Sequence, residues 1–433
     1  MPAGGGLLQL VAQGKQDIFL TGNPQISYFK MVYRRYTNFA MESQPMYFDG
    51  TANFGQRISC LIPRRGDLLG KVYIDVLLPG LTLTDGTPVS YVNSIGNALI
   101  QEVTFEVGEQ QIDKQTGEWM EIWEQLTTPL SQRDALNTML GRLDGYPVPD
   151  LIPGTSSEGL RLYVPLQFYF CRNPGLYIPL LALQYHPIRI NITIAPLKSL
   201  FYSTQLITVP NCTLTTNPAS ITSMMLWGDY IYLDVEERRR FVSKSHEYLI
   251  EQIQYTPLIG VTANQTQITI QTDFNHPIKE FIFVAKRDFM NQVNEPFNYS
   301  SLAINEALPA VVRPFLMPGQ VRTDLIATAL LQLDGYDRFQ VRSAPYFRLV
   351  QPYDHHTTTP VQNFIYCYSL ALRPEDAQPT GTLNASRIDS VNWQITMNAN
   401  LNGTQGACSI RIYALNYNVF RVINGFGGVL FTI

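Results

Sequence analysis

Five histidines in this chain could bind a metal or transfer a proton, but none completes a motif for either. They are His186, His246, His276, His355 and His356. His246 and Glu247 begin the H-E-x-x-H pattern of zinc proteases, but Ile250 stands where the second histidine is needed. On a strand, the adjacent His355 and His356 would point to opposite faces, and the Thr and Pro residues after them predict a polar loop. We expect no metal role for any of the five.

Phosphate-binding and hydrolase motifs are also incomplete. The segment Gly66–Val72 resembles a phosphate-binding loop, but it has three residues between its glycines instead of four, and Val72 follows Lys71 where Ser or Thr is required. Gly425–Gly428 lacks the G-x-G-x-x-G spacing of dinucleotide-binding sites. The G-x-S-x-G elbow of serine hydrolases does not occur. The sequence therefore predicts no catalytic residue and no cofactor.

The carboxylate pairs and the cysteines also give no clear indication of a catalytic or metal site. Glu236-Glu237 and Glu375-Asp376 lie in turn-like polar surroundings, whereas a glycosidase needs two carboxylates held across a cleft. Without a C-x-x-C pair, we expect buried, reduced thiols rather than disulfides or a cysteine-ligated zinc site. The five cysteines are Cys60, Cys171, Cys212, Cys367 and Cys408. The sequence thus predicts no catalytic, cofactor-binding or metal site.

Glycosylation and membrane signals are weak as well. The N-x-[ST] matches are Asn191, Asn211, Asn264, Asn298, Asn384 and Asn402. We expect them to be chance matches in an Asn/Thr-rich chain, with Asn191 inside a strand, because residues 1–12 lack the features of a secretory signal. No apolar run reaches the 18 residues of a membrane span.

The composition indicates a large folded protein with much covered surface. The chain has 433 residues, of which 45% are hydrophobic and 15% charged, so it is neither disordered nor collagen-like. Its net charge of −4 disfavours direct nucleic-acid binding, which needs a surplus of clustered Lys and Arg. The length favours two domains. Low charge in so long a chain is typical of β-proteins and obligate oligomers.

Strict alternation of apolar and polar residues dominates the chain and predicts strands with one buried face. The alternating segments are residues 72–77, 103–107, 188–194, 364–372 and 391–397. Clusters of Pro, Gly, Asn and Thr separate them, and the βαβ rhythm of a parallel sheet is missing. The predicted fold class is therefore an all-β sandwich.

Few helices are expected. Ser131–Leu140 predicts one within a long loop at residues 127–159. The densest charge run, residues 235–245, predicts a solvated linker or short helix between two domains, and two glutamates among its arginines make it a poor RNA-binding patch.

A faint internal repeat lies on either side of that linker. Phe170–Pro174 resembles Leu370–Pro374, and each is followed by an alternating strand. Upstream, Val107–Ile112 resembles Asp334–Phe339. The first copy carries extra residues that the loop at residues 127–159 can hold. Two similar sandwiches are the coherent interpretation.

Several ordered segments together resemble one family, the double jelly-roll major capsid proteins of nucleocytoplasmic large DNA viruses, including those of chloroviruses and iridoviruses. The resemblance covers residues 7–428. The segments that carry it are residues 10–12, 16–26, 33–39, 183–186, 229–234, 237–238, 240–241, 246–252, 274–277, 337–339, 350–353, 386–389, 416–419 and 425–428. The sequence departs mainly in loops, such as residues 127–159 and 285–322.

The resemblance implies two consecutive eight-stranded antiparallel jelly rolls, at residues 24–234 and 246–433, joined by the linker at residues 235–245. It implies an N-terminal arm at residues 1–23, at the capsomer base. It further implies a homotrimeric, pseudo-hexagonal capsomer that tiles an icosahedral shell and is assembled in the host cytoplasm. The implied partners are neighbouring capsomers, minor capsid and penton proteins, and the internal viral membrane, but not nucleic acid. No enzyme activity is implied.

Two other classes share the jelly-roll architecture and stay open at this point. A carbohydrate-binding module would use exposed aromatic residues, and the chain has 24 Tyr. A jelly-roll glycosidase would need a carboxylate pair in a cleft. A capsid protein should be the dominant protein of a virion, whereas a lectin or an enzyme should not.

Overall fold

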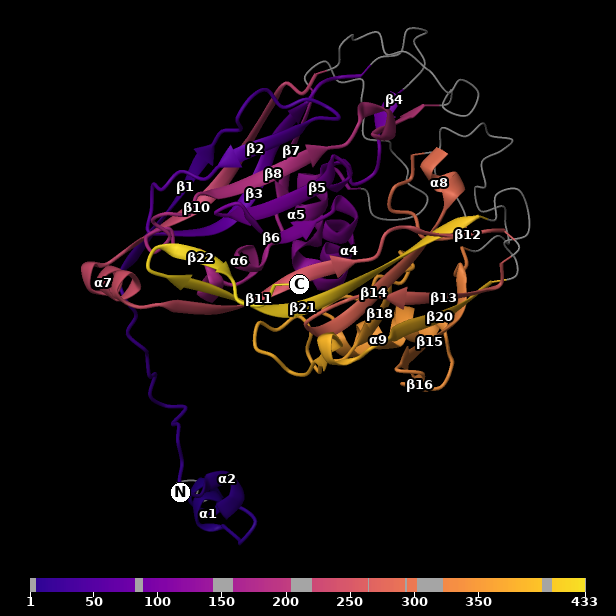
Figure 1. The fold of residues 1–433 in the computed structure, drawn as a ribbon. Coiled ribbons are helices and arrows are strands. Elements are labelled where there is room, and N and C mark those ends of the chain that lie inside the picture. The colour runs from indigo at the N-terminus through magenta and orange to yellow at the C-terminus, as the bar shows by residue number, and fades with distance from the viewer. Residues whose placement is uncertain are drawn as a thin grey trace. The chain divides into compact units, whose positions relative to one another are not determined.

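A computed structural model describes residues 5–81, 89–142, 159–203, 220–263, 265–292, 294–301, 322–398 and 407–432 (Figure 1). The chain divides into two compact units, Met1–Asn38 and Phe39–Ile433. The first unit therefore extends past residue 23, the expected end of the arm. The larger unit contains all the β-strands of the described chain.

The first half of the larger unit is built from two four-stranded antiparallel sheets. One sheet has the order β1 (Phe39–Met46), β10 (Ser223–Leu233), β3 (Leu68–Leu78), β7 (Leu160–Pro165). The other has the order β2 (Arg57–Leu61), β8 (Ile188–Ile194), β5 (Ile100–Val107), β6 (Gln110–Gln115). A short pair, β4 (Val89–Tyr91) and β9 (Phe201–Ser203), lies outside them. We refer to this half as roll 1.

The second half, roll 2, repeats the same strand order. One sheet contains β11 (His246–Tyr255), β21 (Cys408–Ile423), β14 (Pro277–Arg287) and β18 (Tyr366–Ser369). The other contains β13 (Gln267–Thr272), β20 (Val391–Met397), β15 (Ile326–Leu333) and β16 (Tyr336–Asp337). Shorter strands extend these sheets: β12 (Ile259–Val261), β17 (Arg342–Ser343), β19 (Leu383–Asn384) and β22 (Phe426–Val429). The predicted fold class, two consecutive eight-stranded jelly rolls, is confirmed.

The internal repeat is visible in the turns of equivalent hairpins. Strands β5 and β6 join through Gly108 and Glu109, and β15 and β16 join through Asp334 and Gly335. All four turn residues have positive φ, which is the backbone geometry that fits the twist of a two-residue hairpin. Val107 pairs with Gln110 as Leu333 pairs with Tyr336, so the true equivalence is one residue off the sequence prediction.

Helices are few and short, as expected. They are α1 (Gly5–Val11), α2 (Ile18–Thr21), α3 (Ile95–Ala98), α4 (Gly117–Thr127), α5 (Leu130–Leu140), α6 (Tyr169–Arg172), α7 (Val235–Ser243), α8 (Asp288–Gln292) and α9 (Gln351–His355). Helix α5 lies where a helix was predicted. Helix α7 occupies most of the predicted linker and begins at Asp234, whose carboxylate accepts a hydrogen bond from the Val235 N–H.

Each roll has its own hydrophobic core. In roll 1, the isoleucines of β8 alternate inward as predicted, and Ile190, Ile192 and Ile194 are fully buried. In roll 2, Trp393 of β20 is fully buried and contacts Phe281 and Phe283 of the facing sheet. Burying such a side chain contributes about 1.5–3 kcal/mol, so the inward faces supply most of the stabilisation.

A third cluster of apolar side chains joins the two rolls, and we call it the seam. Helix α4 of roll 1 contributes Trp119, Ile122, Trp123 and Leu126, which share one helical face. They pack against the outer face of the β14–β18–β21 sheet, where Tyr413 contacts Trp119 with ring centroids 5.2 Å apart. Figure 1 shows α4 where the strands of roll 1 meet those of roll 2. The two rolls therefore share a continuous hydrophobic contact.

Candidate functional site

Two of the histidines, His246 and His186, lie close to backbone carbonyl oxygens. His246 starts β11, and its Nε2 lies 2.7 Å from the carbonyl oxygen of Phe241, at the end of α7. Glu247 forms an ion pair with Arg421 on the neighbouring strand, at 2.9 Å. The Nδ1 atom of His186 lies 2.8 Å from the carbonyl oxygen of Gly427. These contacts fix where strands and turns meet.

The glycine-rich segments serve packing. Gly70 lies in β3, and a Cβ atom there would stand 2.8 Å from the ring of Tyr177. Gly425 has a φ of +86° in the turn before β22, and a Cβ atom there would stand 2.6 Å from the ring of Tyr185. Both glycines let an aromatic ring lie directly on the backbone. The segment Gly66–Val72 leads into β3 and forms its first residues rather than a phosphate-binding loop.

Four of the five cysteines, Cys60, Cys171, Cys367 and Cys408, are buried free thiols, as expected, and Cys212 lies outside the described residues. Among the N-x-[ST] matches, Asn191 lies in β8 as predicted, but it is buried and donates to the Thr104 hydroxyl at 3.2 Å. Asn298 is also buried, whereas Asn384 is exposed in β19. Asn211, Asn264 and Asn402 lie outside the described residues.

Polar contacts reinforce the seam between the rolls. Glu118 of α4 accepts hydrogen bonds from Arg411 and from the Tyr413 hydroxyl, each at 2.7 Å. Arg172 of roll 1 pairs with Glu251 of roll 2 at 2.8 Å, and Glu251 also pairs with the fully buried Lys279. Removing one partner of a buried ion pair leaves an uncompensated charge, so these pairs fix one arrangement of the two rolls.

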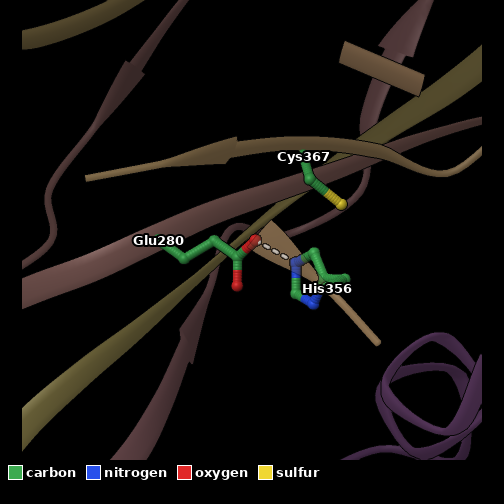
Figure 2. A group of neighbouring side chains, drawn as sticks. All are labelled: Glu280, His356 and Cys367. Atoms are coloured by element: carbon green, nitrogen blue, oxygen red, sulfur yellow. Dashed lines mark hydrogen bonds and ion pairs between the residues drawn. The ribbon is translucent and has the colours of Figure 1, made fainter. Parts of the chain in front are cut away.

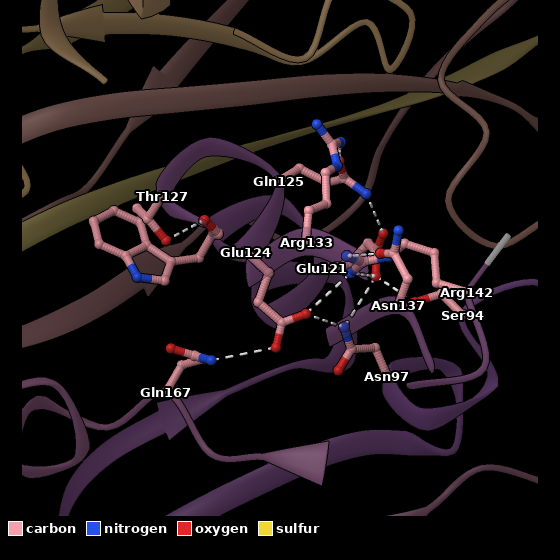
Figure 3. A network of polar contacts seen from close by, with 11 residues as sticks. Ser94, Asn97, Glu121, Glu124, Gln125, Thr127, Arg133, Asn137, Arg142 and Gln167 are labelled. Atoms are coloured by element: carbon pink, nitrogen blue, oxygen red, sulfur yellow. Dashed lines mark hydrogen bonds and ion pairs between the residues drawn. The ribbon is translucent and has the colours of Figure 1, made fainter. Parts of the chain in front are cut away.

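A buried polar network lies on the opposite side of α4 (Figure 3). Arg142 lies 2.6 Å from Glu121 and 3.0 Å from Glu124, and all three side chains are nearly inaccessible. The Asn97 amide donates to both carboxylates, at 2.9 and 2.8 Å. Helix α4 is thus buried on both sides, by apolar side chains at the seam and by hydrogen-bonded polar groups inside roll 1.

The two carboxylates of this network differ in their affinity for protons. Burial raises the pKa of Glu124 to about 7, and the nearby charge of Glu121 adds to that increase despite the pull of Arg142. Burial also disfavours the charged form of Glu121, but Arg142 outweighs it and lowers the pKa of that carboxyl. One arginine therefore keeps one of two neighbouring carboxylates ionised, while the other titrates near neutrality.

A second buried cluster contains His356, Glu280 and Cys367 (Figure 2). The His356 Nε2 lies 2.5 Å from a Glu280 oxygen, and its Nδ1 lies 2.9 Å from Glu375. The expected polar loop is wrong for His355, which ends α9, whereas His356 follows the helix in a loop with its side chain fully buried. Glu375, expected in turn-like polar surroundings, orients this ring.

The Cys367–His356–Glu280 arrangement has the residue types of a cysteine nucleophile with its base. Burial raises the pKa of the Cys367 thiol to about 11, so the thiol is protonated at neutral pH. All three side chains are buried, which keeps a substrate away from the sulfur. The cluster therefore has the composition of a nucleophile site without its accessibility.

A cavity of about 220 Å³ opens between roll 1, the end of α7 and the β21–β22 turn of roll 2, lined by residues that include Tyr185, Val242, Lys244 and Asn424. It is smaller than the 300–1,000 Å³ of typical small-molecule sites. Its lining carries no carboxylate pair of the kind that glycoside hydrolysis requires.

The N-terminal unit exposes the most conspicuous apolar surface. Leu7, Leu8, Leu10 and Val11 of α1, together with Phe19 and Phe29, are each more than 65% exposed. Within the described residues, no helix has the length and apolar character needed to cross a membrane.

The chain resembles known proteins along almost its whole length. A family model for the major capsid protein N-terminus matches residues 27–234, and one for the large eukaryotic DNA virus major capsid protein matches residues 237–428. The major capsid protein of Phaeocystis pouchetii virus is 37% identical, covering 99% of both chains. That of Paramecium bursaria Chlorella virus 1 is 35% identical, also covering 99% of both chains.

The fold comparison agrees. A chain in a quasi-atomic model of the PBCV-1 virus capsid has a TM-score of 0.76 to this chain and 31% identity, covering 94% of this chain and 100% of the solved one. The family matches fall on roll 1 and roll 2 in turn, so the assignment rests on both sandwiches and on the order in which they follow one another. The chain belongs to the major capsid proteins of large eukaryotic DNA viruses.

Proposed function

We propose that this chain self-assembles into homotrimeric, pseudo-hexagonal capsomers that tile the icosahedral shell of a large DNA virus. The observation that carries the proposal is the full-length similarity to a chain of the PBCV-1 virus capsid. Two rolls of the same strand order, joined at the seam, give each subunit two similar β-sandwiches. Three such subunits supply six sandwiches, a number that suits a hexagonal outline.

Its proposed role is structural rather than enzymatic. The cluster with nucleophile-like composition is buried, and the related proteins named above are capsid proteins. The proposed partners are neighbouring capsomers, minor capsid and penton proteins and, at the inner face, the viral membrane. A net charge of −4 supports the absence of direct nucleic-acid contact. We propose that assembly takes place in the host cytoplasm. Residues 235–245 are the proposed linker between the rolls.

Two measurements on the purified full-length chain test this proposal. Multi-angle light scattering should give three times the 49.0 kDa chain mass at micromolar concentration, because an obligate interface buries well over about 1,600 Å². Electron microscopy of the same sample should show hexagonal particles. A stable monomer at that concentration, or trimers without hexagonal outline, would contradict the proposal.

A further inference from the structure

The buried cluster around His356 has the composition of a metal centre and the outer hydrogen bonds that such centres have. Glu280, His356 and Cys367 each offer one ligand atom, and these three atoms lie within 4.8 Å of one another. Carboxylate oxygen, imidazole nitrogen and thiolate sulfur are the ligand types that Zn²⁺ accepts. The sequence did not predict this group, because its members are separated by up to 87 positions and join only when β14 pairs with β18.

The backbone fixes two of the ligands next to each other. Glu280 lies opposite Ser369 in the β14–β18 ladder, and Cys367 lies opposite Ile282. Directly opposed residues of an antiparallel pair share a face, so Glu280 and Cys367 project to the same side of the sheet. Figure 2 shows the imidazole of His356 beside the Glu280 carboxylate, with the Cys367 sulfur on the same side. The ligand atoms are thus held by regular structure rather than by a loose loop.

The outer contacts of His356 have the form found at metal-binding histidines. Its Nδ1 lies 2.9 Å from Glu375, which in turn accepts hydrogen bonds from the Thr357 N–H, at 2.8 Å, and from the Thr357 hydroxyl. A carboxylate on Nδ1 fixes the tautomer and leaves Nε2 as the ligand. That Nε2 is the atom facing Glu280.

One buried atom in the cluster has no partner among the described residues. Glu280 is fully buried, and its Oε2 makes no hydrogen bond, although Oε1 lies 2.5 Å from His356. A single proton between Nε2 and Oε1 satisfies one carboxylate oxygen and leaves the other orphaned. A cation bound to the carboxylate compensates the negative charge that its two oxygens share.

We propose that Glu280, His356 and Cys367 bind one Zn²⁺ ion, with Glu375 as the outer partner of His356. Zinc ligands in a tetrahedral site lie about 3.3 Å apart, so Nε2 and Oε1 must separate by less than ~1 Å to admit the ion. Binding releases two protons, one from the Glu280–His356 contact and one from the Cys367 thiol. The positive charge of the ion then stabilises the thiolate.

The position of this centre gives the ion a structural role. Two residues after His356, the Thr358 N–H donates to the Leu126 carbonyl at 2.9 Å, and the Thr358 hydroxyl donates to the Thr128 carbonyl at 2.8 Å. These carbonyls belong to the end of α4. Zinc therefore fixes the segment that joins roll 2 to the C-terminus of the seam helix.

Elemental analysis of the purified full-length chain tests the site. After supplementation with zinc and dialysis against metal-free buffer, we expect about one zinc per wild-type chain and less than a tenth of that in Cys367→Ala. Cys60→Ala is the matched control, because Cys60 is a fully buried thiol in roll 1 and its loss leaves the same small cavity. Zinc-free wild-type protein would mean that a proton alone bridges the cluster. Equal zinc in Cys367→Ala would show that zinc binds elsewhere. Either result overturns the proposal.

Cobalt and chelation provide readouts that a merely destabilised variant would not reproduce. Co²⁺ in the wild-type chain should give thiolate-to-cobalt charge-transfer absorption, and this band should be missing in Cys367→Ala but present in Cys60→Ala. Glu375→Gln should keep the band and weaken zinc affinity about 10- to 100-fold. A chelator should lower the thermal midpoint of the wild type and of Cys60→Ala, but not that of Cys367→Ala. An identical chelator response in all three proteins would contradict the site.

Discussion

Glu121 and Glu124 lie one turn apart on α4 and share Arg142, and all three side chains are nearly inaccessible to solvent. Two buried carboxylates that share one cation cannot both ionise at low free-energy cost. Burial raises the pKa of Glu124 to about 7, so Glu124 is the carboxylate that takes up a proton. The asymmetry follows from partners: the Ser94 hydroxyl and the Gln125 amide donate to Glu121, whereas Glu124 receives the Gln167 amide at 3.2 Å. A side chain that titrates near neutrality therefore lies buried on the roll 1 side of α4.

Glu124 should make the free energy of unfolding depend on pH in a definite direction. Because the pKa of Glu124 rises from its usual 4.5 to about 7 on folding, the folded state binds more protons than the unfolded state between those values. The contribution of Glu124 to stability is thus complete below about pH 4.5 and is lost as pH rises through 7. In Glu124→Gln, the free energy of unfolding relative to wild type should rise with pH across that window, by at most about 1.4 kcal/mol per unit.

Urea unfolding at several pH values measures this difference. Arg142 keeps Glu121 as its partner in the variant, so the fold should persist. Glu106→Gln is a suitable control, because Glu106 lies in β5 with an ion pair of 3.9 Å to the exposed Arg57. A pH-independent difference between Glu124→Gln and wild type would show that Glu124 is ionised throughout.

Between the elements, α4 joins the rolls, and Trp119 is one of its fully buried seam residues. Trp119→Ala removes contacts with Trp123 and Tyr413 and should lower the free energy of unfolding by about 3–5 kcal/mol. Leu130→Ala on α5 is the control, since Leu130 is 74% exposed and its loss should change stability by less than about 0.5 kcal/mol. Denaturant unfolding monitored by fluorescence compares them. Equal stability of the two variants would exclude α4 as the connection.

Helix α4 also shows where sequence reasoning succeeds and where it fails. Its pattern is readable: Thr116 accepts a hydrogen bond from the Trp119 N–H at 3.2 Å, and apolar residues follow at helical spacing. The apolar–polar alternation of β8 and β20 is more regular than the helical spacing of α4, so the prediction favoured strands and missed this helix. By contrast, the cluster of Glu280, His356 and Cys367 has no local pattern, because strand register and the end of α9 bring its members together. The strands were predictable from local alternation, whereas contacts set by register were not.

In the whole molecule, residues 1–22 belong to the smaller N-terminal unit. This segment exposes Leu7, Leu8, Leu10, Ile18 and Phe19, although exposed leucines reduce solubility. We expect the chain lacking residues 1–22 to fold and to form trimers, but to assemble poorly into shells. Light scattering measures the trimer, and electron microscopy of assembly reactions measures the shells. Insoluble or unfolded protein after truncation would place this segment in the core and refute the arm.

The order in which the strands pair determines when each sheet can be completed while the chain is being synthesised. In roll 1, β10 completes its sheet once residue 233 has been synthesised. In roll 2, β21 lies between β11 and β14, so both strands wait for residues 408–423 before they gain that neighbour. Until then, two strand edges and the seam face of α4 stay open to other chains. Translation speed and chaperone supply during the synthesis of residues 288–423 therefore bear on how much of the chain reaches the folded state.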